Sequence, residues 1–187
     1  MNDAELITKA KEFATRVHQG QLRNDIYDNP YIIHPQEVVE LVTASGGSTA
    51  EIAAAWLHDT VEDTPTTIEE IRKQFGDEIA EIVDGLTDFP EFEKLPLAER
   101  KAKQAERVRG ESASVKRVKL ADQASNVAGI EKMRAMPVTR GLEYADGAKK
   151  IAEECKGISP FLDDLFQERY QKALENLNNG NTASANI

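Results

Sequence analysis

Hydrophobic residues recur at every third or fourth position along most of the chain, which is the period of an amphipathic helix. The pattern predicts helices over about residues 3–19, 34–45, 48–64, 67–75, 77–86, 97–108, 115–127, 142–152 and 160–177. The β-like run at residues 31–33 is too short for a convincing strand. We therefore expect an all-α fold, with its helices packed in a single domain.

Capping residues and helix breakers mark several of the predicted boundaries. Ser48 and Glu51 have the spacing of a capping box, and Pro65 ends the helix that they begin. Gly20 ends the first helix, for which Asp3 is an available cap. These signals make the helix boundaries more specific than periodicity alone.

Two internal segments and the end of the chain lack helical periodicity. Residues 21–31 and 89–97 contain Asn, Asp or Pro and are predicted to be connections. From Asn178 onward the composition turns to Asn, Gly, Ser and Ala. We therefore expect a folded domain over residues 1–177 and a flexible tail over 178–187.

Length and composition limit the classes of function. A chain of 187 residues with 40% hydrophobic and 30% charged residues suits one soluble globular domain. Thirty-three acidic residues against 23 Lys and Arg give a formal net charge of −10, which argues against a nucleic-acid or anionic-membrane surface. A small-molecule ligand is favoured instead, and any phosphate on it would need local cations.

The expected location is the cytoplasm. No apolar run approaches the roughly 20 residues of a membrane span, and the N-terminal residues lack the form of a signal peptide. The single cysteine, Cys155, excludes an internal disulfide and a cysteine-based metal cluster, and it fits a reducing compartment.

The most distinctive polar residues follow directly on an apolar stretch. Residues 52–57 are apolar and favour a helix, and His58, Asp59, Glu62 and Asp63 come next. In a continuous helix, residues four apart lie one turn from each other, so one imidazole and three carboxylates would share an edge. Such crowded carboxylates repel one another unless a cation or a shared proton compensates, and a metal ion is the simplest compensation. The alternative is a helix end where acidic residues face water.

Two further segments supply candidate partners for this cluster. His34 stands before a proline at the start of the second predicted helix, and Asp122 shares a helix face with Lys119 and Asn126. His18 closes the first helix, where a cation meets the carbonyl ends, so we expect a structural or substrate-edge role for it. Two histidines with one or two aspartates form a nitrogen and oxygen set that suits manganese, iron or zinc rather than calcium.

The order His34, His58-Asp59, Asp122 resembles the metal signature of the HD phosphohydrolase superfamily. Within it, the sequence is more similar to the hydrolase domain of the RelA/SpoT alarmone enzymes, and in length to the stand-alone small alarmone hydrolases. Seven matching blocks run in the family's order through nearly the whole chain. They are residues 14–18 with 20–23, 30–35, 54–64, 75–76, 83–87, 118–122 with Asn126, and 143–144.

The resemblance implies a single helical HD-domain bundle and a manganese-dependent enzyme. The implied reaction removes the 3′-diphosphate from guanosine tetra- or pentaphosphate and leaves GDP or GTP with pyrophosphate. By motif position, Glu62 and Asp63 would be the catalytic pair that orients and deprotonates the attacking water. The implied ligands of the metal ion are His34, His58, Asp59 and Asp122.

The resemblance also implies contacts with the nucleotide. Arg23 would pack on the guanine base, Asn126 would lie near the ribose or the 5′ phosphates, and Tyr144 would belong to the nucleotide pocket. Lys119 is a candidate phosphate contact because it shares the helix face of Asp122 and Asn126. Without the resemblance, Arg23 would be interpreted as a solvated loop residue, and the alternative for Lys119 is a surface lysine.

The sequence leaves several alternatives open. It departs from many family members at Asn24, where they carry lysine, and at residues 123–126, where they carry Arg-Leu-His-Asn or a similar run. The same site would serve a hydrolase of adenosine analogues or NADPH, or a non-catalytic nucleotide sensor, and a helical interaction module with solvated acids is a third class. The intact Glu62-Asp63 pair favours an enzyme, because a sensor needs affinity and not an activated water. No synthetase domain follows, so we expect degradation only, and a homodimer is one option for the oligomeric state.

Overall fold

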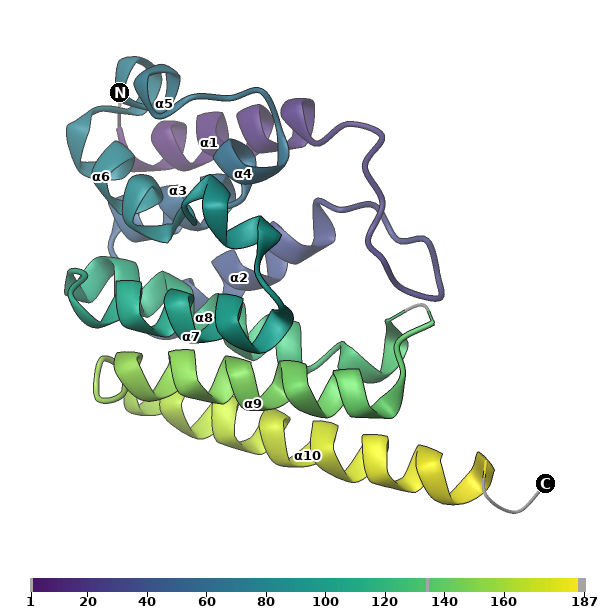
Figure 1. Ribbon diagram of the computed structural model, residues 1–187. Coiled ribbons are helices and arrows are strands. Elements are labelled where there is room, and N and C mark those ends of the chain that lie inside the picture. Colours follow the sequence, from purple (N-terminus) through teal and green to yellow (C-terminus); the bar gives the residue numbers. More distant parts are fainter. Residues whose placement is uncertain (1, 134, 185–187) are drawn as a thin grey trace.

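Helices carry almost all of the regular structure in the computed structural model, which describes residues 2–133 and 135–184 (Figure 1). They are α1 Asp3–Val17, α2 Ile33–Ala44, α3 Thr49–Leu57, α4 Thr60–Asp63, α5 Ile68–Phe75, α6 Asp77–Leu86, α7 Leu97–Arg109, α8 Ala113–Val127, α9 Val138–Cys155 and α10 Pro160–Ser184, with 3₁₀ turns η1 Pro90–Lys94 and η2 Ile130–Lys132. Across these described ranges, β pairing is limited to isolated bridges. The predicted all-α fold is confirmed.

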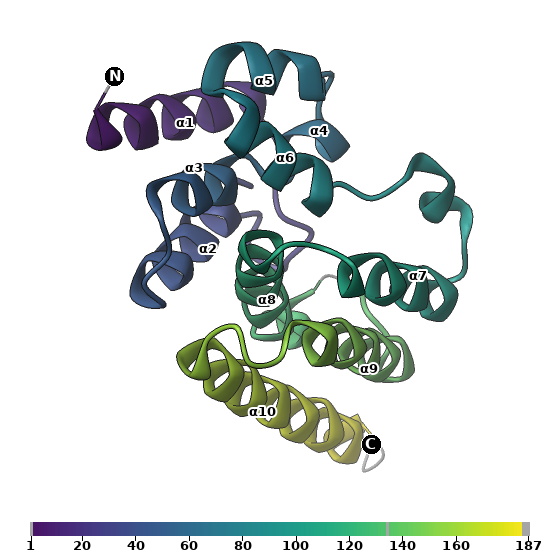
Figure 2. The ribbon, with the colours of Figure 1, turned by 90° about the vertical axis from the view of Figure 1, so that its left-hand side faces the viewer.

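The helix α8 lies in the middle of the molecule. Figure 2 shows α2 and α3 on one side of it, α6 above it, and α9 and α10 below it, and α8 contacts all five. Residues 120–125 of α8 are buried without interruption, which is more than one full turn, so this part of the helix is enclosed on every side. Asp122, Gln123 and Ser125 are therefore polar groups inside the fold and need polar partners there.

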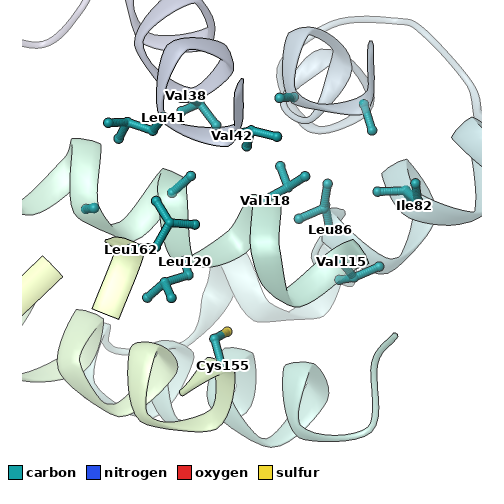
Figure 3. Close-up of a cluster of buried hydrophobic side chains, with 14 of the residues drawn as sticks. Val38, Leu41, Val42, Ile82, Leu86, Val115, Val118, Leu120, Cys155 and Leu162 are labelled. Carbon is teal, nitrogen blue, oxygen red and sulfur yellow. The ribbon is translucent and has the colours of Figure 1, made fainter. Parts of the chain in front are cut away.

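A continuous hydrophobic core surrounds α8. Val118 faces Val42 of α2 and Leu86 of α6, while Leu120 points the other way, toward Cys155 of α9 (Figure 3). The side chains of these five residues are at most 3% exposed. Packing on opposite faces of α8 fixes both its position and its rotation, and hence the direction in which its polar residues point.

The capping box predicted at Ser48 and Glu51 is present. The Ser48 hydroxyl accepts a hydrogen bond from Glu51 N, and the Glu51 carboxylate accepts one from Ser48 N at 2.7 Å. The expectation that Asp3 caps the first helix is wrong. Asn2 is the cap, because the capping box pairs it with Glu5, the acidic residue three positions later.

The helix predicted over residues 48–64 is also not continuous. It breaks after Leu57, and α4 starts at Thr60. At the break, the Thr60 hydroxyl donates to the carbonyl oxygen of Leu57 at 2.7 Å, and Nδ1 of His58 bonds to the carbonyl oxygen of Ala55 at 2.8 Å. These side chains compete with the backbone for the carbonyl groups of the last helical turn, which gives a physical reason for the break.

The predicted connection over residues 21–31 is irregular and lies beside the segment between α8 and α9. Ile26 N donates to the carbonyl oxygen of Lys132 at 2.9 Å, and Figure 1 shows the two segments side by side. The connection over residues 89–97 contains the 3₁₀ turn η1. The first connection borders a recess of about 440 Å³, and the second borders one of about 690 Å³.

The C-terminal helix is longer than predicted. α10 continues to Ser184 and so includes part of the segment that we expected to be a tail, while residues 185–187 lie outside the described part of the chain. The flexibility of residues 178–187 stays a prediction. Within the described residues, none of the helices combines the length and the apolar character that crossing a bilayer requires.

Candidate functional site

Four polar side chains from three separate segments converge beside α8. Nε2 of His34 lies 3.3 Å from Nε2 of His58. Oδ2 of Asp59 lies 2.9 Å from Nε2 of His58, and Oδ1 of Asp122 lies 3.2 Å from Nε2 of His34 and 3.8 Å from that of His58. Two ligands of one ion, each about 2.1 Å from it, can be at most about 4.2 Å apart, so these separations suit a shared ion. The structure thus brings together all four residues that the sequence suggested as ligands.

Hydrogen bonds set the direction in which each imidazole presents its lone pair. Nδ1 of His58 bonds to the Ala55 carbonyl, which can only accept, so Nε2 of the neutral ring carries the lone pair. Nδ1 of His34 bonds to the Ser125 hydroxyl at 3.0 Å, and that hydroxyl donates to Glu37, so it accepts from the ring. Both Nε2 lone pairs therefore point at the carboxylates of the cluster, and this arrangement of acceptors fits a divalent cation.

The two carboxylates are also held by donors. The Tyr31 hydroxyl donates to Oδ2 of Asp59 at 2.5 Å. The side-chain amide of Asn126 donates to Oδ1 of Asp122 at 2.6 Å, and that of Gln123 donates to Oδ2 of Asp122 at 2.8 Å. A nitrogen and oxygen donor set with each member fixed from outside is the usual construction of a metal site in a protein.

When no cation is bound, an added proton relieves the repulsion among the acceptor groups of these four side chains. Burial disfavours a charged imidazole, but the Asp59 carboxylate outweighs this effect and raises the pKa of His58 to about 9. The site is thus one that attracts positive charge.

Glu62 and Asp63 line a second feature, a recess of about 690 Å³ beside η1. Glu62 accepts a hydrogen bond from Asp88 N at 2.5 Å. Although much of the residue is exposed, desolvation of its carboxyl group raises the pKa of Glu62 to about 7, against the opposite effect of Lys119. Burial, together with the charge of Asp59, also raises the pKa of Asp63. A carboxyl group with a pKa of about 7, as at Glu62, suits proton transfer near neutral pH.

The predicted nucleotide contacts lie in two places. Arg23 and Asn126 line a recess of about 440 Å³, whose wall includes Tyr31 and the candidate ligand His34. Lys119 and Tyr144 do not line it.

Lys119 instead faces the acidic groups of the cluster, with Nζ 3.9 Å from Oδ2 of Asp122 and 3.3 Å from the Leu86 carbonyl oxygen. Tyr144 is half-buried and carries the ammonium of Lys101 over its ring, 4.4 Å from the centroid.

The sequence matches the family described as HD domain over residues 10–158, a range that contains all four converging side chains. The chain belongs to the HD domain family.

Named relatives narrow the position of the chain within the HD domain family. The chain is 38% identical over 173 residues to guanosine-3′,5′-bis(diphosphate) 3′-pyrophosphohydrolase MESH1 of Xenopus tropicalis, covering 90% of this chain and 95% of that protein. It is 33% identical to MESH1 of Homo sapiens, covering 91% and 96%. A solved structure described as a metazoan ortholog of SpoT that hydrolyses ppGpp matches with a TM-score of 0.82 and 28% identity over 90% of this chain and 96% of that one. The expected similarity to the small alarmone hydrolases is confirmed.

Some residues around this HD-domain site were not predicted from the sequence. Tyr31 lies within residues 30–35, which match the family, but the sequence was not interpreted as giving it a role. Its position three residues before His34 could have indicated that it lies near the ligands. Ser125 and Glu37 are 88 positions apart, and nothing in the local sequence indicates that they meet. Lys101 is 5% exposed and bonds to Gln123, yet it occurs in a strongly charged stretch that predicts a solvated face.

Proposed function

We propose that the chain hydrolyses the 3′-diphosphate of guanosine tetra- or pentaphosphate to GDP or GTP and pyrophosphate. The observation that carries the proposal is the convergence of His34, His58, Asp59 and Asp122 beside a pair of carboxyl groups with raised pKa values. The names of the MESH1 relatives support the choice of substrate.

His34, His58, Asp59 and Asp122 would hold one divalent cation, and we propose Mn²⁺ because it accepts both imidazole and carboxylate ligands. A cation held there would supply positive charge against the phosphoryl oxygens and would make water more acidic. Hydrogen bonds keep these ligands in orientation: Ser125 for His34, the Ala55 carbonyl for His58, Tyr31 for Asp59, and the amides of Asn126 and Gln123 for Asp122.

Glu62 would act as the general base. Its Oε1 is occupied by Asp88 N, which leaves Oε2 to take a proton from the attacking water. The water oxygen then bonds to the phosphorus that carries the ribose 3′ oxygen, the bond between that phosphorus and the 3′ oxygen breaks, and the 3′ oxygen takes up a proton. Asp63, one residue further, would help to orient the water.

The nucleoside would lie in the recess lined by Arg23 and Asn126. Arg23 would stack on the guanine base, and Asn126, which already bonds to Asp122, would lie near the ribose or the 5′ phosphates. Lys119 would offset the negative charge of the phosphates, and Tyr144 would border the nucleotide from α9. A cytoplasmic location and a homodimer stay predictions.

Incubation of the purified protein with guanosine tetraphosphate and Mn²⁺ tests the proposal. We expect equal amounts of GDP and pyrophosphate, and none when a chelator removes the metal. Parallel reactions with an adenosine analogue and with NADPH establish whether the site prefers guanine. Tight binding of guanosine tetraphosphate without product would contradict the proposal and favour a nucleotide sensor.

A further inference from the structure

The candidate ligand His34 is supported by a chain of hydrogen bonds that runs away from the metal centre. Its Nδ1 lies 3.0 Å from the Ser125 hydroxyl, and this hydroxyl donates to Oε2 of Glu37 at 2.8 Å. The other carboxylate oxygen of Glu37, Oε1, accepts from the Arg169 guanidinium at 2.7 Å. Ser125 of α8 thus links two residues of α2, His34 and Glu37. Arg169 then links Glu37 to the C-terminal helix α10.

The hydrogen bonds that run from His34 through Ser125 to Glu37 leave only one possible position for each proton. The Glu37 carboxylate accepts on both oxygens, so the single hydroxyl proton of Ser125 is used toward Glu37. The Ser125 oxygen must then accept from Nδ1 of His34, and Nε2 of the neutral ring is left with its lone pair toward the metal centre. A neutral partner in place of Glu37 would not fix the hydroxyl in this direction.

Arg169 holds Glu37 from outside. Its guanidinium donates to Glu37 and also to the Ala124 carbonyl oxygen at 3.1 Å, so it ties the carboxylate to the α8 backbone next to Ser125. The Glu37 and Arg169 side chains are 32% and 24% exposed, so water screens the ion pair only in part.

We propose that Glu37 is a positioning residue for the metal ligand His34 and acts on it through Ser125. The proposal rests on the proposed metal site, because it concerns the orientation of one of its ligands. Outer partners of ligating histidines contribute about 10- to 100-fold to metal affinity. Loss of either Ser125 or Glu37 should therefore weaken Mn²⁺ binding without removing the site.

A second role for Glu37 has to be separated from this one. Glu37 and Ser125 also line the 440 Å³ recess in which we place the nucleoside. If Glu37 acted by touching the nucleotide, its loss would raise the KM for guanosine tetraphosphate and leave Mn²⁺ binding unchanged. Metal binding must thus be measured without nucleotide.

The test is an Mn²⁺ titration of the full-length protein, followed through the electron paramagnetic resonance signal of free Mn²⁺. We expect Ser125→Ala and Glu37→Gln each to raise the Kd for Mn²⁺ about tenfold. His34→Ala should bind Mn²⁺ far more weakly still. Glu40→Gln is the matched control, because Glu40 lies on the same helix and, among the described residues, bonds only to exposed Gln36; its Kd should equal that of the unchanged protein.

Kinetics over a range of Mn²⁺ concentrations complete the test. For Ser125→Ala and Glu37→Gln we expect turnover that is lost at limiting Mn²⁺ to recover as Mn²⁺ is raised, because the change lies in metal binding. Unchanged Mn²⁺ binding in both variants, with loss of binding in His34→Ala, would overturn the positioning role and leave the metal site intact. Unchanged binding in His34→Ala would instead overturn the metal site itself. Should Ser125→Ala not fold, as judged by circular dichroism, Glu37→Gln alone decides.

Discussion

At the residue scale, the site consists of acceptors that face one another and donors that hold them from outside. Nε2 of His34 and Nε2 of His58 lie 3.3 Å apart with no proton between them when both rings are neutral. The lone pairs repel one another in this arrangement, and only a cation or an added proton relieves the repulsion. The arrangement therefore costs free energy when both imidazoles are neutral and no cation is bound. It is favourable when a cation is bound.

The roles of His58 and Glu62 can be separated by substitution. His58→Ala removes one lone pair of the cluster, so it should lose both Mn²⁺ binding and turnover. Glu62→Gln keeps the size of the side chain but cannot accept a proton, so turnover should fall at least about 100-fold while Mn²⁺ still binds. Steady-state rates and Mn²⁺ titrations measure the two effects. Normal turnover of Glu62→Gln would show that Glu62 is not the base.

The raised pKa of Glu62 predicts the pH dependence of turnover. Because the carboxyl group must lose its proton to act as a base, kcat should rise with pH through about 7 and then level off. Since its pKa in the folded protein exceeds the ordinary 4.5, the contribution of Glu62 to the free energy of unfolding falls as the pH rises from 4.5 to about 7. The measurement is kcat against pH at saturating Mn²⁺. A constant kcat between about pH 6 and about pH 8 would argue against this role.

At the scale of the elements, the break between α3 and α4 shapes the site. His58 and Asp59 lie at the break, and the short helix α4 then places Glu62 and Asp63 on the wall of the neighbouring recess. Asp63 N donates to the Asp59 carbonyl oxygen at 2.9 Å, so this pair keeps the helical spacing. Because of the break, the ligands His58 and Asp59 and the catalytic carboxylates Glu62 and Asp63 point in different directions although they lie within six residues.

The close packing of α7 against α9 gives a prediction about stability. A Cβ at Gly147 would lie 2.5 Å from Cγ and 2.6 Å from Cβ of the buried Lys101. Gly147→Ala should therefore destabilise the fold by about 1–3 kcal/mol from overpacking, in spite of the better helix propensity of alanine. Urea denaturation measures the change.

Gly110→Ala is the control for this substitution. Its added Cβ would meet no heavy atom closer than 4.0 Å, and its backbone at φ −85° accepts alanine. We expect little change in this variant. A Gly147→Ala protein as stable as the unchanged one would mean that α7 and α9 separate more easily than the distances indicate.

At the scale of the whole molecule, the candidate metal centre links distant parts of the chain. His34 comes from α2, His58 and Asp59 from the break after α3, and Asp122 from the central helix α8. A bound ion would therefore act as a cross-link, since the unfolded chain has no preformed site.

Binding of Mn²⁺ should stabilise the folded protein. At a free concentration 100 times the Kd, an ion that binds only the folded state contributes about 2.7 kcal/mol. The melting temperature should rise with Mn²⁺ for the unchanged protein and not for His58→Ala, as followed by circular dichroism. Equal increases in both proteins would place the stabilising ion elsewhere.

Much of this protein was determined by local sequence. Apolar periodicity gave the helices, and the Ser48-Glu51 pair gave a helix start, because the atoms that form these features are a few residues apart. The adjacent pair His58-Asp59 already indicated a metal centre. The resemblance of the chain to a known family then indicated the ligands that are distant in the sequence, His34 and Asp122.

Only the tertiary structure decided how these pieces meet. The 3.2 Å approach of Asp122 to His34 and the support of His34 by Ser125 and Glu37 depend on how α8 packs between α2 and α10. Packing at that level is fixed by many weak contacts on several faces of one helix. Sequence periodicity states which side of a helix is buried, but not which polar atoms another helix brings to it.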